Sequence, residues 1–511
     1  MPIIHTQSMD PTKMHTAQKL WVYNALDALV TFEVRDALIG QMDPVAKRVY
    51  DFSKSLQAPV LAMMRKGFRV DLGERQKTID EFDKRAAKLQ RRLDQMTLAI
   101  WGKILNPRSP AQCISFFYDF LKLPAVHKTD KKTKVRKRTV DRDALEKLGN
   151  YYIGSIFVSH ILTIRELTKL ASTLRTELDG DRMRCSFNIA GTETGRFSSS
   201  ASAFDTGTNL QNQTERLRRI YVADPGHKLA VFDLKTGESF AVGLKCHLLG
   251  LGRRYLDACF SGDLHTEVTK LVWPGLPWSS GKTAKEIAEQ VFYRHFTYRD
   301  MAKRGGHGTN YYGTPPTMAK HLKVDTKVVE AFQTAYFKAF PEIREWHTWT
   351  AGELQTKAEL TSIMGRRRHF FGRVRDDNTL REAIAYDPQS CIADYTNTWL
   401  RRVYENVRAC DILQQGHDAL VVQYRADHER EVVEQIIYEA SQVRLGGDHP
   451  DGFPIPAEAK IGWNWGKIDP KHKMHSDGNP FGLKDYSGKD DREYIEPPSN
   501  QSRLLDRKFS R

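Results

Sequence analysis

Two aspartates stand where strand-like segments of this sequence end or bend. Asp233 follows the apolar run in "KLAVFDLK", and Asp418 lies between the apolar runs of "LQQGHDALVVQY". An unpaired carboxylate is costly inside a strand, so we expect Asp418 at the bend of a hairpin, with Gly416 supplying the turn freedom. Two carboxylates could hold hard cations such as Mg²⁺, and a pair of such ions would stabilise both oxygens of a phosphoryl transfer. The alternative is two unrelated turn aspartates.

A basic helix lies between them in the sequence. Four side chains recur at every fourth position of "YRDMAKRGGHGTNYYG", namely Arg299, Lys303, His307 and Tyr311. This spacing places them along one face of a helix. A row of cations repels itself unless an anion lies across it, and a triphosphate is such an anion. The alternative is a solvated basic face, but that does not explain the glycines at 305, 306 and 308, which weaken a helix and indicate a close approach or a bend.

Charge and length limit the classes of protein. The chain has 511 residues, which favours two to four domains, and 78 Lys and Arg against 63 Asp and Glu give a net charge of +15. This balance favours a polyanionic partner such as nucleic acid. Residues 127–145, "HKTDKKTKVRKRTVDRDAL", contain a dense basic run that we expect to form a solvated loop. The loop is either a clamp on phosphate backbone or an unpartnered surface loop.

Cysteine spacing and hydropathy point to the cytoplasm. The six cysteines form no Cys-x-x-Cys pair, which argues against a zinc site and a disulfide scaffold. No run of 18 apolar residues predicts a membrane span, and the N-terminus lacks the pattern of a secretory signal.

The pattern of apolar residues predicts helices in the first part of the chain and a mixed α/β region after it. We expect a helix over 19–39, long amphipathic helices over 49–103, and strands alternating with helices from about residue 200. Residues from 470 onward are polar and are expected to form a poorly packed tail.

Six segments, in order, resemble the motifs of family A DNA polymerases, the group of bacterial DNA polymerase I and many phage replicases. They are "TGRFSS" with "TNLQN", "FDLKTGES", "SGDLHTE", "RDMAKRGGHGTNYYG", "GHDALVV" and "IGWNWGKI". The resemblance implies a mixed α/β right-hand fold with an antiparallel palm sheet, helical fingers and a helical thumb. It implies this domain order: 1–48 as a remnant of a 3′–5′ exonuclease-like domain, 49–200 as thumb and connecting helices, 201–260 as palm, 261–380 as fingers, 381–470 as palm, and 471–511 as a polar C-terminal tail.

The same resemblance implies a template-directed DNA polymerase that adds dNTPs to a primer 3′-OH with two Mg²⁺ ions, for which Mn²⁺ may substitute. Asp233, Asp418 and the Leu234 carbonyl would hold the metals. Arg299, Lys303 and His265 would bind the triphosphate, and His307 and Tyr311 would border the base and sugar. Glu238 would crowd a ribose 2′-OH and so select deoxynucleotides.

Contacts with primer-template DNA are also implied. The residues near the primer end would be Arg196, Asn209, Gln211, Asn212, Gln389 and His417. The thumb tip would be the basic loop, with Lys131, Lys132, Lys134, Arg136, Lys137 and Arg138. Such contacts bind backbone and shape and not sequence, as a replicative enzyme needs.

Several positions depart from the family pattern. His307 stands where Phe or Tyr is usual, which puts discrimination against a missing 3′-OH in doubt. Thr236-Gly237 and Leu234 imply a looser sugar pocket. Ala419 stands where the family often has Glu, so the metal site is expected to use two carboxylates.

The front of the chain resembles only the last motif of the family's exonuclease domain, with Tyr23 and Asp27 in "WVYNALDALVTFEVRDAL". One carboxylate cannot assemble a two-metal nuclease site. We therefore expect no proofreading by this chain alone. Either a separate exonuclease polypeptide docks on residues 1–48, or the helix is a structural remnant.

Two other functions compete with this one. A single-subunit phage-type RNA polymerase has similar motifs, but it needs a small residue in place of Glu238. A decayed DNA-binding scaffold is disfavoured by the intact Asp233, Asp418, Arg299 and Lys303. The sequence further suggests a phage replicase in the host cytoplasm and, from "QSRLLDRKF", a sliding clamp as a partner.

Overall fold

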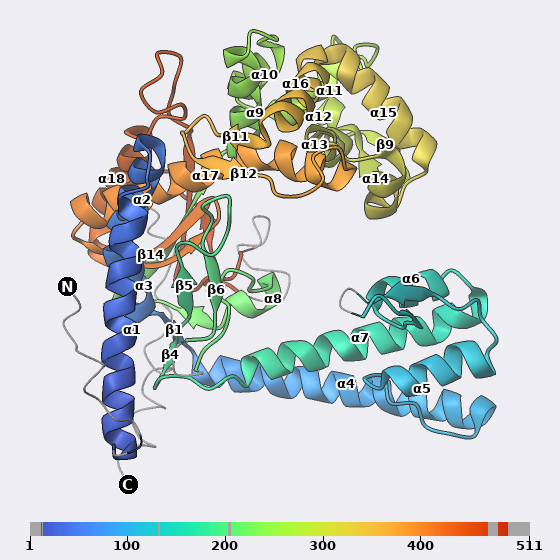
Figure 1. The fold of residues 1–511 in the computed structure, drawn as a ribbon. Helices are drawn as coiled ribbons and strands as arrows, with labels where there is room; N and C mark the ends of the chain where they lie inside the picture. The colour runs from blue at the N-terminus through green and yellow to red at the C-terminus, as the bar shows by residue number, and fades with distance from the viewer. Residues whose placement is uncertain (1–11, 13, 131–132, 203–205, 469–478, 489–511) are drawn as a thin grey trace.

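The computed structural model describes residues 12, 14–130, 133–202, 206–468 and 479–488 (Figure 1). These residues form a mixed α/β fold, with a sheet-centred body from which helical units project. Within the described part of the chain, none of the helices combines the length and apolar character needed to cross a membrane.

A five-stranded antiparallel sheet forms the centre of the body, in the order β13-β14-β8-β15-β16. Its strands are β8 (His227–Leu234), β13 (Cys410–Gly416), β14 (Ala419–Arg425), β15 (Ala457–Gly462) and β16 (Lys484–Asp485). Phe232 and Leu234 are buried whereas Asp233 between them is exposed, because successive side chains of a strand point to opposite faces. The end of β8 therefore presents Asp233 to solvent from a rigidly held backbone.

Three helices cover this sheet and form the main core with it: α9 (Gly237–Leu248), α17 (Asp377–Asn406) and α18 (Glu429–Ser441). The Trp399 ring of α17 lies edge-on to Phe232 of β8, with 6.1 Å between centroids. Its indole Nε1 donates to the Ile436 carbonyl of α18 at 3.0 Å, which satisfies the polar atom of a fully buried ring.

A long helical hairpin projects from the body (Figure 1). It consists of α4 (Leu72–Trp101) packed on α7 (Tyr152–Leu174), with α5 (Pro110–Ile114), the π-helical turn η3 (Ser115–Phe120) and α6 (Arg142–Leu148) at its outer end. The outer end has a separate core that includes Leu93, Phe116, Phe117 and Phe157. This second core stabilises the outer end of the hairpin separately from the main core.

A second projection is helical and follows α9 in the chain (Figure 1). Its helices are α10 (Arg254–Phe260), α11 (Leu264–Val272), α12 (Ala284–Ala288), α13 (Tyr298–Asn310), α14 (Pro315–Leu322), α15 (Thr326–Ala339) and α16 (Pro341–Lys357). Two short hairpins accompany them, β9 (Val291–Tyr293) with β10 (Phe296–Thr297) and β11 (Glu359–Thr361) with β12 (Arg367–His369). The basic helix α13 begins at a capping box of Thr297 and Asp300.

The N-terminal part contains α1 (Thr16–Ile39), α2 (Pro44–Ser55) and α3 (Gln57–Lys66), of which α3 packs on β13. A small antiparallel sheet joins β1 (Phe68–Val70), β4 (Arg182–Met183) and β7 (Tyr221–Val222). The remaining short elements are β5 (Ser186–Asn188) with β6 (Ser198–Ser200), α8 (Glu215–Arg218) and η4 (Ala426–His428). The helices expected over 49–103 are present as the end of α2, α3 and α4, and the strand β1 between α3 and α4 was not expected; its Phe68 and Val70 are buried in the core against later segments.

The expected polar tail is also wrong for residues 479–488. β16 pairs with β15 at the edge of the sheet, and Leu483 and Asn479 are buried. The Asn479 amide exchanges hydrogen bonds of 2.9 and 3.0 Å with that of Asn464, so a polar segment packs here because its polar groups pair. Residues 469–478 and 489–511, including the clamp-like peptide, lie outside the described residues.

The glycines of α13 face neighbouring helices of the same projection. A Cβ added at Gly305 would lie 2.7 Å from the Phe332 ring of α15, and one at Gly308 would lie 2.9 Å from the Met318 methyl of α14. The expected close approach is confirmed, and the approaching groups are protein side chains. The glycines allow α13 to pack closely against α14 and α15, and Lys303 and His307 lie on the exposed face of the helix.

Gly305→Ala is expected to destabilise the protein by about 1–3 kcal/mol, because the added methyl overlaps a buried ring. Gly352→Ala on α16 is the matched control, since its added Cβ meets no atom within 4 Å. That change should be neutral or stabilising by up to about 1 kcal/mol through helix propensity. Thermal unfolding of both variants checks this; equal melting temperatures would show that the close packing of α13 is not needed.

Candidate active site

The turn between β13 and β14 carries Asp418 at the bend of the hairpin, as the sequence predicted. The residue that takes the left-handed conformation is His417, with φ of 63°, and not Gly416. The predicted role of Gly416 is therefore wrong. His can adopt this region at modest cost, and the Asp418 amide donates to the Gly416 carbonyl at 2.8 Å to close the turn.

Asp233 lies near the end of β8, and Asp418 lies in the turn that leads into the adjacent strand β14. In the β8–β14 ladder Asp233 pairs with Ala419, and the Leu234 amide donates to the Asp418 carbonyl at 3.2 Å. Directly paired residues on neighbouring antiparallel strands have Cα atoms about 4.5–5.5 Å apart. The two carboxylates, far apart in the sequence, are thus held as neighbours by backbone pairing, and both residues are exposed.

Burial and neighbouring negative charges raise the pKa values of both aspartates. Surrounding protein and, second, the Asp418 charge raise the pKa of Asp233 to about 6. Partial burial raises the pKa of Asp418, and the Glu238 charge adds to this rise. Two mutually repelling carboxylates open to solvent are a chemical match for divalent cations, which would remove the repulsion.

A third carboxylate, Glu458 of β15, pairs with Asp233 from the other side in the ladder. Its negative charge raises the pKa of Asp233, while it forms an ion pair of 3.1 Å with Lys235. The sequence did not predict this residue, because no local pattern indicates which residue lies opposite Asp233 on a neighbouring strand. No group of three or more His, Cys, Asp or Glu side chains in the described part of the chain has the geometry of a metal site.

Glu238 stands in the first turn of α9 and joins two other predicted site residues. Arg196 forms an ion pair with one of its carboxylate oxygens, and the Tyr311 hydroxyl donates to the other at 2.5 Å. Burial, followed by the Glu238 charge, raises the pKa of Tyr311 well above its ordinary value, so the hydroxyl stays protonated. Tyr311 directly follows α13, so this contact links the basic helix to Glu238, whose charge acts on Asp418.

The basic row lies on the outer face of α13, where Lys303 and His307 are exposed. Arg299 donates to Asp263 at 2.9 Å. Burial raises the pKa of the Asp263 carboxyl, but the hydrogen bonds from Arg299 and Thr266 and the Arg299 charge outweigh burial and lower this pKa to about 2. Asp263 was missed, although its place at the N-cap of α11 was readable from "SGDLHT".

His265 belongs to the same cluster. Burial and then the Arg299 and Lys303 charges lower the pKa of its imidazole to about 4, so it is neutral at pH 7. The neutral ring can donate one hydrogen bond without adding charge. The predicted triphosphate residues Arg299, Lys303 and His265 are therefore brought together.

A family model for DNA polymerase family A matches residues 76–467. The chain belongs to DNA polymerase family A. The DNA polymerase I, thermostable, of Thermus aquaticus is 28% identical over 393 residues, covering 73% of this chain and 43% of the relative. That of Thermus filiformis is 27% identical over 403 residues, covering 74% and 44%. The chain spans about half the length of the curated relatives it matches.

Solved structures agree on the fold. The POL domain of Pol1 from M. smegmatis, in complex with DNA primer-template and dNTP, has a TM-score of 0.64 and 23% identity to this chain, covering 80% of it and 69% of the solved chain. The mixed α/β right-hand fold predicted from the sequence is confirmed for this family A chain.

The residues that the family resemblance implied for the duplex are partly engaged within the protein. Asn209 exchanges hydrogen bonds with Ser199 at 2.7 and 2.8 Å, and Gln211 donates to the Gln415 carbonyl at 3.0 Å. Asn212 is exposed and Gln389 is half-buried on α17. His417 lies near Arg196, whose charge adds to burial in lowering the pKa of its imidazole.

The basic segment that was expected to be a solvated loop contains a β-hairpin of β2 (His127–Thr129) and β3 (Arg136–Arg138). Lys134, Arg136, Lys137 and Arg138 are exposed, and Arg138 also pairs with Asp119 at 2.6 Å. The predicted Lys131 and Lys132 lie outside the described residues. The β2–β3 pairing holds the backbone of these basic residues in place while their side chains remain exposed to solvent.

Tyr23 and Asp27 lie on α1, and both are exposed. None of the residues of α1 is buried, and its exposed apolar side chains include Trp21, Val30 and Phe32. A helix with apolar residues all round is normally covered.

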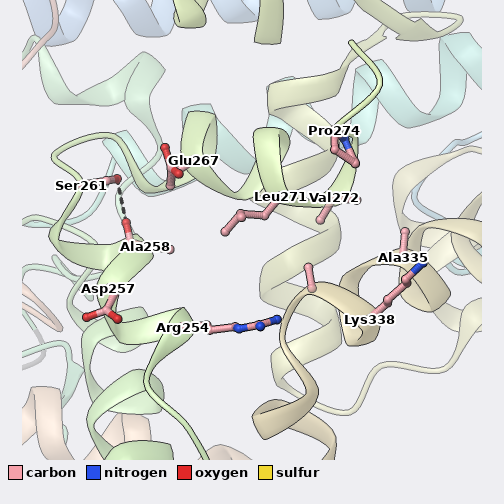
Figure 2. Close-up of a pocket in the computed structure, with 11 residues that line it drawn as sticks. Arg254, Asp257, Ala258, Ser261, Glu267, Leu271, Val272, Pro274, Ala335 and Lys338 are labelled. Carbon is pink, nitrogen blue, oxygen red and sulfur yellow. Dashed lines mark hydrogen bonds between the residues drawn. The ribbon is translucent and has the colours of Figure 1, made fainter. Parts of the chain in front are cut away.

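A separate hollow of about 630 Å³ lies among the helices α10, α11 and α15 (Figure 2). Arg254 and Lys338 extend toward it, and Glu267 and Leu271 come from α11. Its lining residues do not include Asp233, Asp418 or Glu238.

Proposed function

We propose that this chain is a template-directed DNA polymerase that adds dNTPs to a primer 3′-OH. The observation that carries the proposal is the placement of Asp418, at the β13–β14 turn, beside Asp233 at the end of β8, where the Leu234 amide donates to the Asp418 carbonyl and the Glu238 charge raises the pKa of Asp418. The cationic row of α13 supplies the second half of the site. Residues 201–260 and 381–470 would act as palm, 261–380 as fingers and 49–200 as thumb with its connecting helices.

Asp233 and Asp418, with the Leu234 carbonyl, would hold two Mg²⁺ ions, for which Mn²⁺ may substitute. The donor set fits, because both carboxylates are exposed, adjacent and mutually repelling, and Mg²⁺ takes its further oxygens from water and phosphates. When bound, such ions would lower the pKa of the primer hydroxyl and neutralise charge on the departing pyrophosphate.

The protein side chains bind and orient the nucleotide. Arg299 and Lys303 would neutralise the triphosphate, with Arg299 exchanging Asp263 for phosphate oxygens. Neutral His265 would donate a hydrogen bond to the same group. His307 and Tyr311, whose rings lie 4.7 Å apart, would border the base and sugar. A movement of the fingers that brings α13 toward Asp233 and Asp418 would complete the site.

Glu238→Ala is expected to reduce discrimination of dNTPs over NTPs by about tenfold to a hundredfold, because space opens beside the sugar 2′ position. The measurement is the ratio of kcat/KM for dNTP and NTP in primer extension. Glu267→Ala is the control, since Glu267 also lies in a first helical turn but pairs with Lys270. An unchanged ratio for Glu238→Ala would refute the gate role.

The choice between dNTPs and NTPs, which Glu238 would control, also separates the two competing functions from this one. An RNA polymerase would extend with NTPs in preference to dNTPs, and a decayed scaffold would bind duplex without extending a primer. Parallel extensions with dNTPs and with NTPs separate all three possibilities.

Arg196, Asn209, Gln211, Asn212, Gln389 and His417 would contact the duplex near the primer end, and the β2–β3 hairpin would contact its backbone. The exposed cations of that hairpin support a sequence-independent contact. A role in phage or bacterial replication in the host cytoplasm, with a sliding clamp as partner, belongs to the same proposal.

We propose that a separate exonuclease polypeptide docks on residues 1–48, and the exposed apolar surface of α1 supports this. The pure chain is then expected not to degrade mismatched primers, since one carboxylate cannot assemble a two-metal site and no metal-binding group of three or more His, Cys, Asp or Glu side chains among the described residues includes Asp27. Release of label from a mismatched 3′ end is the assay, with extension of a matched primer as the activity control. Robust degradation that disappears in Asp27→Ala would contradict the prediction.

A further inference from the structure

Buried polar side chains connect the hairpin of Asp418 with the loop that carries Arg196. Asn397 of α17 is 1% exposed and lies between them. Its Nδ2 donates to the Gly195 carbonyl at 3.0 Å, and its Oδ1 accepts from Gln415 Nε2 at 3.3 Å. One side chain therefore contacts both segments.

On the hairpin side, Gln415 is fully buried in β13. Its Nε2 also lies 3.4 Å from the His417 carbonyl, at the left-handed residue of the bend. The Gln415 amide thus ties the bend to α17 through Asn397. The bend in turn fixes where Asp418 stands.

On the other side, Gly195 is buried and has φ of 80°, a conformation that side chains rarely adopt. A Cβ there would lie 2.6 Å from Nε of Arg366, which is itself held by Asp394 at 2.7 Å. The Gly195 backbone is therefore fixed between Arg366 and Asn397. The next residue, Arg196, pairs with Glu238, which also accepts from Tyr311.

We propose that Asn397 is a positioning residue that sets Arg196, and through it the Glu238 carboxylate, relative to the Asp418 hairpin. It thereby determines how strongly the site discriminates deoxynucleotides from ribonucleotides. The inference rests on the proposed polymerase function. Loss of the Asn397 donor leaves the buried Gly195 carbonyl unsatisfied, so this loop would shift and carry Arg196 away from Glu238.

The test uses Asn397→Asp and Asn397→Ala in the full chain. Asp keeps an acceptor for Gln415 but cannot donate to Gly195 as a carboxylate, whereas Ala removes both bonds. We expect both to lower the ratio of kcat/KM for dNTP over NTP by roughly fivefold to thirtyfold. This ratio does not depend on the fraction of active protein, so a merely destabilised enzyme would keep it.

Thr396→Val is the matched control. Thr396 is fully buried on the same helix, and its hydroxyl has no hydrogen-bond partner in the described part of the chain. Its replacement should leave the ratio within about twofold of that of the parent chain. If the Asn397 variants do not fold, Gln415→Met removes the other of the two Asn397 bonds, frees Asn397 from the hairpin, and should also lower the ratio.

A double variant shows whether Asn397 acts through the gate. In a Glu238→Ala background, Asn397→Asp should change the ratio no further, because residues acting in series are not additive. An unchanged ratio in all the single variants, or full additivity in the double variant, would overturn the inference. Failure of the parent chain to extend a primer with dNTPs would instead overturn the proposed function.

Discussion

Asp418→Ala is expected to reduce the rate of primer extension by about a thousandfold or more. The carboxylate stands at a hairpin bend beside Asp233, and the Glu238 charge lies close enough to raise its pKa. Removing either aspartate removes half of the proposed metal-binding oxygens. Single-turnover extension of a labelled primer with saturating dNTP and Mg²⁺ measures the effect.

Duplex affinity separates this loss from unfolding. Asp418→Ala should bind primer-template with affinity within about threefold of the parent, because phosphate contacts dominate binding. Asp427→Ala is the control, since Asp427 is an exposed aspartate just beyond the same hairpin that pairs with Arg425. Extension at the parental rate by Asp418→Ala would show that the metal assignment is wrong.

Lys303→Ala is expected to lower kcat/KM for dNTP by about tenfold to a hundredfold, because a charge-assisted contact to phosphate is worth roughly 1.5–3 kcal/mol. Lys303 is exposed on α13 next to Arg299 and His265, and it lies close enough to lower the pKa of the latter. Arg299→Ala should have an effect of similar or larger size, since a guanidinium can bind phosphate oxygens in pairs.

Arg304→Ala tests whether charge alone is responsible. Arg304 follows Lys303 directly, but its guanidinium lies over the Phe296 ring, with 5.4 Å to the centroid, on another part of the helix surface. Steady-state extension should be nearly unaffected by its removal. Equal losses of kcat/KM in Lys303→Ala and Arg304→Ala would show that α13 acts through its general positive charge and not through a specific contact of Lys303 with the triphosphate.

The sequence predicted best where one residue type at one spacing leaves few alternatives. The four-residue spacing of Arg299, Lys303 and His307 predicted a helical face, and the structure has them on α13. Asp418 between two apolar runs predicted a hairpin bend, and the strand register confirms it. In both cases the local pattern itself carries the geometry.

The sequence predicted least where function depends on which strands are neighbours. Glu458 lies beside Asp233 only because β15 pairs with β8, and nothing in "PAEAKIG" indicates that partner. Asn397 was missed for the same reason, since its two partners lie on separate segments of the fold. Residues 479–488 looked like a tail because their packing depends on paired polar groups and not on apolar periodicity.

The most direct test of the central claim is extension of a primer on a defined template with each dNTP supplied alone and Mg²⁺ present. The proposed function predicts addition only of the nucleotide that is complementary to the next template base, at a rate that falls to background in Asp418→Ala. Addition that ignores the template, a preference for NTPs, or no addition by a folded chain that binds the duplex would contradict it.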